Sequence, residues 1–96
     1  MNFNAILQQP TPYETRIALR DRFRARRKEH KLSQQALAEK ADVSLGSLKR
    51  FESNGNISLN SLIKLSVALG YQADFDLLFS QKHYRSIQDV IDDKTR

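Results

Sequence analysis

The stretch from residue 32 to residue 54, LSQQALAEKADVSLGSLKRFESN, constrains the fold of this chain more than any other part of it. It contains two short amphipathic runs, and Ser33 and Ser44 stand where each run begins. A serine in this position can accept a hydrogen bond from a free N–H group of the first helical turn. Asp42 marks the turn between the runs, and Val43 is expected to be buried. The pattern predicts two helices joined by a tight turn, with a polar outer face on the second.

The flanking segments also carry the signals of helices. Thr11 can cap a helix that has Pro12 in its first turn and extends to about His30. Ser58 can cap another helix, which is the most apolar segment of the chain and ends at Gly70. Residues 73–79 predict a short fifth helix, although residues 71–79 could form a strand instead. The buried positions expected in these helices are Ile17, Ala18, Leu19, Phe23 and Ala25 in the first, Leu37, Ala38 and Ala41 in the second, Leu48 and Phe51 in the third, and Leu59, Leu62, Ile63, Leu65, Val67 and Leu69 in the fourth.

The chain has the size of one small domain, and we expect an all-α fold. Its 96 residues include only three glycines and two prolines, and its apolar residues recur at helical rather than strand spacing. Residues 1–10 are expected to form a flexible N-terminal arm, residues 11–79 the folded body and residues 80–96 a short tail. The tail resembles a capped helical turn at residues 86–91, and it could contact a second copy or another partner.

Composition argues against several classes of protein. The chain has no cysteine, which excludes disulfides and thiolate metal sites and fits residence in the cytoplasm. His30 and His83 lie far apart, and the sequence shows no pair of nucleophile and base and no phosphate-binding loop. We therefore expect no metal, no cofactor and no enzymatic activity. The N-terminal residues lack the pattern of a signal peptide, and no apolar run approaches the roughly 18 residues of a membrane span.

Positive charge is concentrated in the first predicted helix. Residues 13–31 contain eight arginines and lysines and three acidic residues, and they account for the whole net charge of +5. An arginine-rich helix is often only a solvated surface, but it can also provide the phosphate contacts that supply most nonspecific affinity for DNA. The neighbouring helix pair favours the second interpretation, with Arg26 and Arg27 as phosphate contacts.

A helix that reads DNA keeps one face apolar for anchoring and presents polar groups to the base edges near its N-terminus. Arg50 is the best candidate for a bidentate contact to guanine. Glu52 is instead expected to have a structural role, while Gln34 and Lys49 have simpler alternatives as a helix-start residue and a solvated charge. The predicted base contacts are Ser44, Leu45, Gly46, Ser47, Lys49 and Arg50, and the predicted phosphate contacts are Ser33, Gln34, Arg26, Arg27 and Asn54.

Three motifs follow one another through the central part of the chain. They are LSQ followed by LA in residues 32–38, V-S-x-x-x-L-x-x-F-E in residues 43–52, and S-L-x-x-L-x-x-L-x-x-A-L-G in residues 58–70. Together they resemble the helix-turn-helix domain of the Cro/C1-type (xenobiotic-response-element) repressor family. The resemblance covers residues 19–79 and implies a five-helix bundle, usually dimeric, that binds operator DNA.

Two positions depart from the pattern of that family. Asp42 stands where the turn usually has glycine, which is tolerable because aspartate adopts positive φ more easily than most residues. Leu45 and Gly46 replace polar residues that many members use to read bases. Leu45 could contact a thymine methyl group, and Gly46 could allow close approach, so direct readout would depend mainly on Arg50 and Lys49.

The resemblance implies a sequence-specific transcriptional repressor that acts as a homodimer on an inverted repeat of double-stranded operator DNA. Residues 44–79 are also similar to HipB-like antitoxins, which are paired with HipA-like kinase toxins. We therefore expect the antitoxin and autorepressor of such an operon, located in the bacterial cytoplasm and associated with the nucleoid. The alternatives are a stand-alone or phage-type repressor and a helical interaction module that does not bind DNA.

Overall fold

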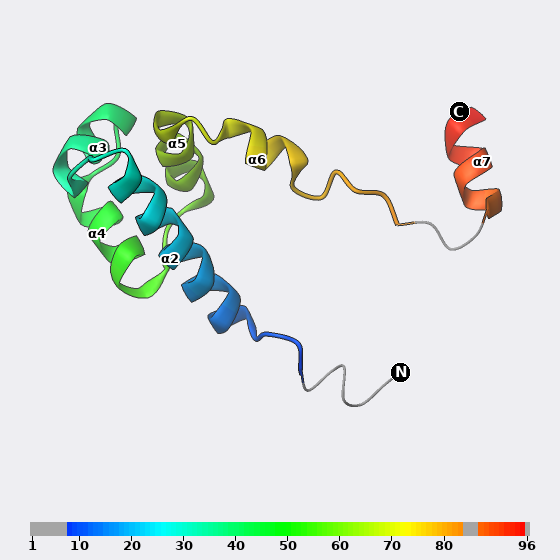
Figure 1. The fold of residues 1–96 in the computed structure, drawn as a ribbon, viewed down its shortest axis with the longest axis horizontal. Helices are drawn as coiled ribbons and strands as arrows, with labels where there is room; N and C mark the ends of the chain where they lie inside the picture. Colours follow the sequence, from blue (N-terminus) through cyan, green and yellow to red (C-terminus); the bar gives the residue numbers. More distant parts are fainter. Residues whose placement is uncertain (1–7, 84–86, 96) are drawn as a thin grey trace.

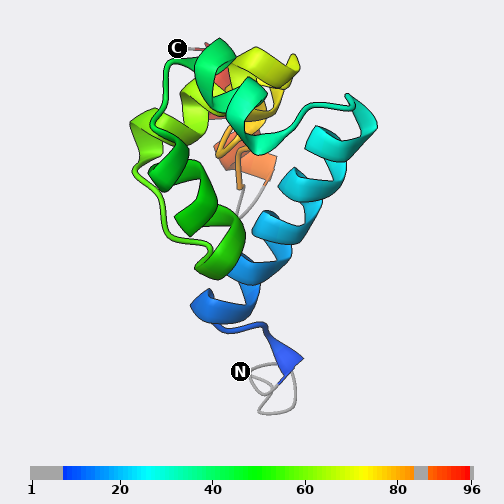
Figure 2. The ribbon, with the colours of Figure 1, turned by 90° about the vertical axis from the view of Figure 1, so that its left-hand side faces the viewer.

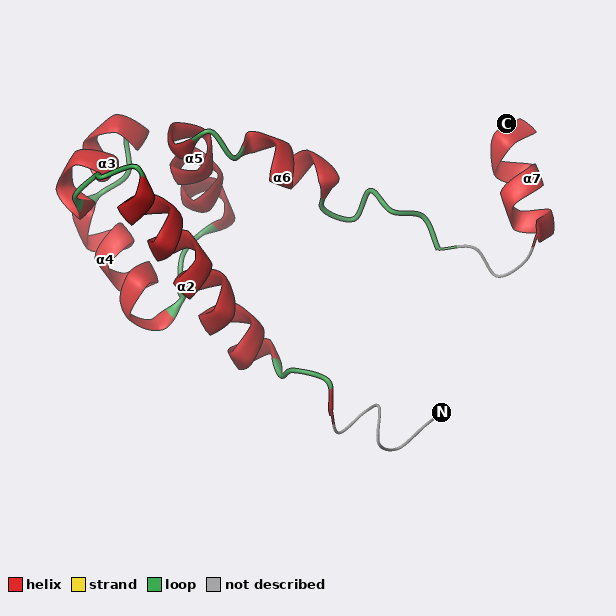
Figure 3. Cartoon of the chain, in the orientation of Figure 1, coloured by secondary structure: helices red, strands yellow, loops and turns green. Residues whose placement is uncertain are grey.

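The structure is a computed structural model that describes residues 8–83 and 87–95 (Figure 1). Within these residues the chain is helical and has no strand (Figure 3). Residues 72–77 form a helix, so the strand alternative for this segment is wrong. The helices are α2 (Pro12–Glu29), α3 (Gln34–Ala41), α4 (Leu45–Asn54), α5 (Leu59–Leu69), α6 (Gln72–Leu77) and α7 (Ile87–Thr95).

The expected all-α fold is confirmed for the described residues, with a difference in the number of helices. Six helices are seen there rather than five, because the predicted tail contains α7. The fifth predicted helix corresponds to α6, which begins one residue earlier than expected and ends two residues earlier. Most of the predicted N-terminal arm lies outside the described residues, as does the first residue of the helical turn predicted at residues 86–91.

Side-chain caps begin the helices α2 to α5, as the sequence predicted. Each capping hydroxyl accepts a hydrogen bond from the backbone N–H group three residues later, over 3.0 to 3.1 Å. A cap of this kind satisfies one of the free N–H groups of the first turn and contributes about 1 kcal/mol. The capping residues are Thr11, Ser33, Ser44 and Ser58.

Three helices end at a residue in the left-handed conformation. Asp42 (φ 55°) ends α3, Gly55 (φ 78°) ends α4 and Gly70 (φ 85°) ends α5. The conformation of Asp42 confirms that aspartate can occupy the turn between α3 and α4. Gly55 has a second reason to be glycine, because a Cβ atom there would lie 2.7 Å from Cγ of Arg16. These turns keep the connections short and bring α3, α4 and α5 together.

The apolar core lies between α2, α3, α4 and α5. The rings of Phe23 and Phe51 meet edge to face, with their centroids 5.1 Å apart, an arrangement that adds about 1 kcal/mol to the burial of the rings. Because α3 packs against both α4 and α5, the core fixes the angle between α3 and α4. The buried apolar residues are Phe23, Leu37, Ala38, Ala41, Leu48, Phe51, Leu65 and Leu69.

The buried face of α2 differs from the prediction. Phe23 is buried as expected, but Ala18 and Leu19 are exposed. The face of α2 that meets α4 instead carries arginines, including Arg20 and Arg24, which reach backbone carbonyl groups near the end of α4. The arginines of α2 are therefore not all part of a solvated surface.

The exposure of α5 also differs from the prediction. Leu65 and Leu69 are buried, whereas Leu59, Ile63 and Val67 are exposed. The three exposed residues recur at every fourth position, which places them on one face of the helix. α5 therefore contributes one face to the core and leaves a second apolar face uncovered within the described chain.

The last two helices lie on the side of the body away from α3 and α4. α6 packs against α5 and leads away from the body, and α7 follows at the end of the chain (Figure 1). In Figure 2, α3 and α4 are in front and the segments of α6 and α7 are behind them. The outer sides of α3 and α4 are consequently not covered by α6 or α7.

Candidate nucleic-acid interface

Helix α4 presents one polar stripe to solvent. Gly46, Lys49, Arg50 and Ser53 are all exposed, and their spacing of three and four residues places them on one face of the helix. The opposite face is anchored in the core. Within the part of the chain that the structure describes, neither Lys49 nor Arg50 has an ion-pair or hydrogen-bond partner. The two charges are thus free to meet a ligand outside the chain.

Gly46 leaves an open place in this stripe. A Cβ atom at this position would meet no atom within 4 Å, and Gly46 is not among the residues with positive φ. Neither packing nor backbone conformation therefore requires glycine here, although glycine weakens a helix relative to alanine. This geometry is compatible with the predicted role of Gly46, in which the missing side chain allows a ligand to approach the backbone closely.

The first residues of α4 are less available than the sequence suggested. Leu45 is half-buried and packs against the apolar core, so the expectation that it faces outward is corrected. The hydroxyl of Ser44 accepts a hydrogen bond from the N–H group of Ser47 over 3.1 Å and donates to the Ser47 hydroxyl over 2.7 Å. Both serines thus stabilise the start of the helix, and the polar surface of α4 is concentrated at Lys49 and Arg50.

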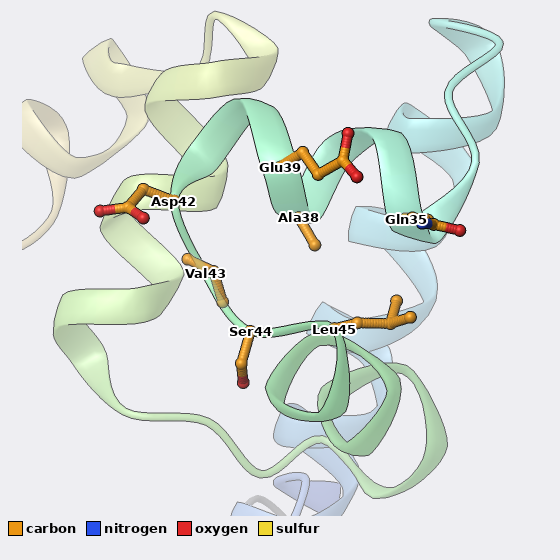
Figure 4. A pocket seen from close by; sticks show the side chains of 7 residues that line it. All are labelled: Gln35, Ala38, Glu39, Asp42, Val43, Ser44 and Leu45. Carbon is orange, nitrogen blue, oxygen red and sulfur yellow. The ribbon is translucent and has the colours of Figure 1, made fainter.

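A shallow groove runs along α3, the turn and the start of α4 (Figure 4). Its lining includes the carboxylates of Glu39 and Asp42 and the apolar side chains of Val43 and Leu45. Both carboxylates are exposed, and Asp42 lies 3.9 Å from the ammonium group of Lys64. Because negative groups repel phosphate, this groove is not suited to contact the DNA backbone.

The start of α3 carries two of the predicted phosphate contacts. Ser33 is exposed, and its hydroxyl accepts the N–H group of Ala36 over 3.0 Å. Gln34 is half-buried, and its side-chain amide donates to Oε1 of Glu52 over 3.3 Å. The free N–H groups and the dipole of a helix N-terminus favour anions. Ser33 and Gln34 therefore lie where a phosphate can bind, and Gln34 also connects α3 to α4.

A buried ion pair joins α2 to α4. Nε and Nη2 of Arg27 donate to the two carboxylate oxygens of Glu52 over 2.7 and 2.8 Å, and Nη1 donates to the carbonyl of Leu32 over 2.8 Å. Arg27 is 9% exposed and Glu52 is 2% exposed. The structural role predicted for Glu52 is confirmed. The phosphate contact predicted for Arg27 does not fit this geometry, because its guanidinium is buried and each of its nitrogens is used within the chain.

The partners of Glu52 determine its protonation. Burial raises the pKa of its carboxyl, but the hydrogen bonds and positive charge of Arg27, together with hydrogen bonds from Gln34 and Arg24, outweigh burial. The pKa of Glu52 is consequently lower than its ordinary value. The carboxylate is therefore ionised at neutral pH and can hold Arg27 and Gln34 at the same time.

Two more arginines of α2 bind carbonyl groups in the last turn of α4. Arg24 donates to the carbonyl of Glu52, and Arg20 donates to the carbonyl of Ser53 over 2.7 Å. These carbonyls have no partner within the helix, and positive charge beside them also stabilises the helix dipole. Sequence reasoning missed both contacts.

The spacing of the arginines could have revealed these contacts. Arg16, Arg20, Arg24 and Arg27 recur every three or four residues and share one face of α2 with Phe23. Arg16 belongs to this face, because its side chain packs against Gly55. Half of the eight basic residues in the predicted basic segment therefore face the body of the protein. The net charge of the segment overstates the charge that it offers to a ligand.

The other two predicted phosphate contacts, Arg26 and Asn54, also lie on the surface. Arg26 is exposed and pairs with Glu29 over 2.9 Å. An exposed pair of this kind contributes at most about 1 kcal/mol, so the guanidinium can exchange its partner for a phosphate. Asn54 is exposed at the end of α4, and its side-chain oxygen accepts the N–H group of Asn56 over 2.9 Å. Both residues stay predictions as phosphate contacts.

Residues 8–83 and 87–95 contain no cluster of three or more histidine, aspartate and glutamate residues that could hold a metal ion. None of their helices is both long enough and apolar enough to cross a membrane. The candidate site therefore consists of the exposed stripe of α4, the start of α3 and the surface of α2.

Helices α3 and α4, joined by residues 42–44 and carrying a polar stripe opposite the core, form a helix-turn-helix unit. A family model described as helix-turn-helix matches residues 23–75, which is more than half of the chain. The chain belongs to this helix-turn-helix family, the Cro/C1 type, and the match supports a sequence-specific DNA-binding regulator. Neither the curated proteins nor the solved structures that were compared gave a match.

Proposed function

We propose that this protein is a transcriptional repressor that binds an inverted repeat in operator DNA as a homodimer. The observation that carries the proposal is the exposed stripe of Gly46, Lys49 and Arg50 on a helix whose other face is held in the core. Two copies of α4 would enter successive major grooves about 34 Å apart. The spacing of the two half-sites would then be fixed by the dimer.

In this proposal α4 reads the bases through few side chains. Arg50 donates two hydrogen bonds to the O6 and N7 atoms of a guanine, and Lys49 contacts a neighbouring acceptor. Gly46 allows the backbone of α4 to lie close to the base edges, since nothing occupies the position of a side chain there. With so few direct contacts, much of the specificity comes from the spacing of the half-sites and from the shape of the DNA.

The phosphate contacts come from the start of α3 and from exposed surface groups. Ser33 and Gln34 bring a helix N-terminus to one phosphate, and Arg26 and Asn54 contribute contacts elsewhere. Glu52 acts as a positioning residue, because it is part of α4 and its carboxylate also accepts the side-chain amide of Gln34 over 3.3 Å. One carboxylate thereby couples the phosphate-binding end of α3 to the helix that reads the bases.

We further propose that the repressor is the antitoxin and autorepressor of an operon that encodes a HipA-like kinase. The support for this partner is the similarity of residues 44–79 to HipB-like proteins. The protein would act in the bacterial cytoplasm at the nucleoid and would itself have no enzymatic activity. Co-purification of the native protein with a kinase would support this proposal, and purification without one from cells that express the whole operon would count against it.

Selection of binding sites from random DNA duplexes tests the DNA-binding function. We expect an enriched inverted repeat, saturable binding to it and a steep fall of affinity with salt. Arg50→Ala should reduce the discrimination between the selected and a scrambled duplex by about 1–3 kcal/mol, because one bidentate contact is lost. Lys94→Ala, which removes an exposed charge on α7, is the matched control and should keep the discrimination.

The outcome of the selection also separates the two classes of function. Unchanged discrimination in Arg50→Ala would refute the role of this residue. Weak and equal binding of the wild-type protein to both duplexes would favour the helical interaction module over the repressor. The far-UV circular dichroism spectrum of each variant should match that of the wild type, since Arg50 and Lys94 are both exposed.

A further inference from the structure

Exposed apolar side chains gather on two helices that pack against each other, α5 and α6. The first group is the α5 stripe, which consists of Leu59, Ile63 and Val67. The second is the α6 tip, residues 77–79, at the end of α6 and just after it; Leu77 is 69% exposed and Phe79 is 94% exposed. A soluble monomer rarely leaves this much apolar surface on neighbouring elements, so the two groups indicate an interaction surface.

The α6 tip is a defined turn that holds its apolar side chains outward. The backbone N–H group of Ser80 donates to the carbonyl of Leu77 over 3.0 Å, and the Ser80 hydroxyl donates to the same carbonyl over 2.6 Å. Leu78 has φ −63° and ψ 125°, and Phe79 has φ 61°. These angles are those of a type II turn, in which the third position favours glycine or asparagine. A bulky phenylalanine there is unusual and, in the isolated chain, contacts almost nothing.

We propose that the α6 tip of one copy packs on the α5 stripe of a second copy, and that the exchange is reciprocal. This inference rests on the proposed homodimer and identifies its surface. The six side chains of the stripe and the tip expose on the order of 700 Å² per copy, close to the roughly 800 Å² that each partner buries in a specific interface. The exposed area of these residues is therefore of the size that such an interface would use.

The arrangement fits a second copy because each chain carries both a projecting apolar group and an exposed apolar helix face. A two-fold dimer brings the same patch of both copies together, so that a projecting group on one copy meets a receiving group on the other. The tip projects, the stripe runs along one face of a helix, and the contact between α5 and α6 keeps the two groups adjacent in each chain. α6 leads away from α3 and α4 (Figure 1), and the α5 stripe and the α6 tip belong to other helices than Lys49 and Arg50. Dimer formation through them should therefore leave the polar stripe of α4 exposed.

Sedimentation equilibrium of the full chain and of exposed-site variants tests the surface. Phe79→Ser and Val67→Ser should each raise the dissociation constant of the dimer about ten-fold or more, as expected for apolar residues at an interface centre. Ile87→Ser, which removes a largely exposed apolar side chain from α7, is the matched control and should leave the constant unchanged. A monomeric wild type, or dimers unchanged in both variants, would overturn the proposal.

Cross-linking gives a second measurement that does not depend on the stability of the variants. The chain has no native cysteine, so Phe79→Cys chains can be mixed with Val67→Cys chains that carry a different tag. We expect a disulfide between the two tagged chains under mild oxidation and none between Ile87→Cys and Val67→Cys chains. A cross-link that forms only through residue 87 would show that α7, and not the α6 tip, covers the stripe.

DNA binding is measured in parallel so that the two proposals can fail separately. A Phe79→Ser chain should bind a duplex with one half-site as the wild type does, but it should lose the added affinity for two half-sites. If the wild type forms the predicted cross-link but does not bind DNA, the function proposed above fails and the interface stands. If it binds the inverted repeat but forms no cross-link at residue 79, the interface fails and the function stands.

Discussion

Replacing Glu52 with glutamine tests how the recognition helix is held. Both carboxylate oxygens of Glu52 accept hydrogen bonds from Arg27, at 2.7 and 2.8 Å, and the group is 2% exposed. Glutamine keeps the volume of the side chain but turns one acceptor into an NH₂ group that faces the N–H groups of Arg27. Removing one charge of a buried pair costs about 3–5 kcal/mol, because the other charge is left buried. Arg27 keeps its bond to the carbonyl of Leu32, so we expect a loss near the lower end, about 3 kcal/mol.

Urea denaturation followed by far-UV circular dichroism at neutral pH measures this loss. A small domain has a free energy of unfolding of about 5–15 kcal/mol, so the midpoint of the transition should fall strongly while its slope stays the same. Glu39→Gln, which neutralises an exposed carboxylate on α3, is the matched control and should change stability by less than about 0.5 kcal/mol. If Glu52→Gln lowered the free energy of unfolding by less than about 1 kcal/mol, the reasoning would be refuted, because an unpaired buried charge should destabilise the fold by more than this.

The same pair of proteins gives a test of pH dependence. The pKa of Glu52 is lower in the folded protein than its ordinary value of 4.5. A carboxyl of this kind stabilises the fold above its unfolded pKa, and the stabilisation is lost as the pH falls through the folded pKa. The stability difference between the wild type and Glu52→Gln should therefore have its full size at neutral pH and shrink as the pH falls below 4.5 and through the folded pKa. A difference that stays the same well below pH 4.5 would mean that the charge of Glu52 is not its cause.

Two further substitutions separate binding from stability. Gly46→Ala should stabilise the protein by about 0.5–1 kcal/mol, because alanine favours the helix and nothing lies within 4 Å of its Cβ atom. It should also weaken binding to the selected operator. Unchanged binding in fluorescence anisotropy would show that Gly46 is not part of the DNA interface. Arg26→Gln should weaken binding to all duplexes alike and reduce the slope of log affinity against log salt by about one. A loss confined to the operator would contradict the phosphate role of Arg26.

The limits of the helices could be predicted because their signals are local. The cap at Ser33 needs only the backbone of the next three residues, and its hydroxyl accepts the N–H group of Ala36 as expected. The left-handed turn at Asp42 likewise depends on the conformational preference of one residue. The packing angle between α3 and α4 follows from the core residues that were read from the helical spacing. The helix-turn-helix unit was therefore visible in the sequence.

The faces of α2 and α5 could not be predicted in the same way. Leu19 was expected to be buried because it is apolar, but Arg20 packs towards α4 and donates to the carbonyl of Ser53. An arginine can bury its stem if its guanidinium finds an acceptor, and that acceptor is 33 residues further along the chain. Val67 was expected in the core for the same reason as Leu65, but it lies on the face of α5 that the described chain leaves uncovered. A correct prediction of these two faces would have required knowledge of residues distant in the sequence or of a second molecule.

Two faces of α4 have different tasks, and the arginines of α2 account for this division. Arg20 and Arg24 bind carbonyls in the last turn of α4, and Arg27 holds Glu52 there. The side of the helix that meets α2 is thus fixed by charge as well as by the core, whereas Lys49 and Arg50 remain exposed on another side. The positive charge of the chain is consequently divided between a set that stabilises the fold and a set that can meet DNA. Substitutions in the first set should change the free energy of unfolding at any salt concentration, whereas those in the second should change DNA binding and leave the free energy of unfolding nearly the same.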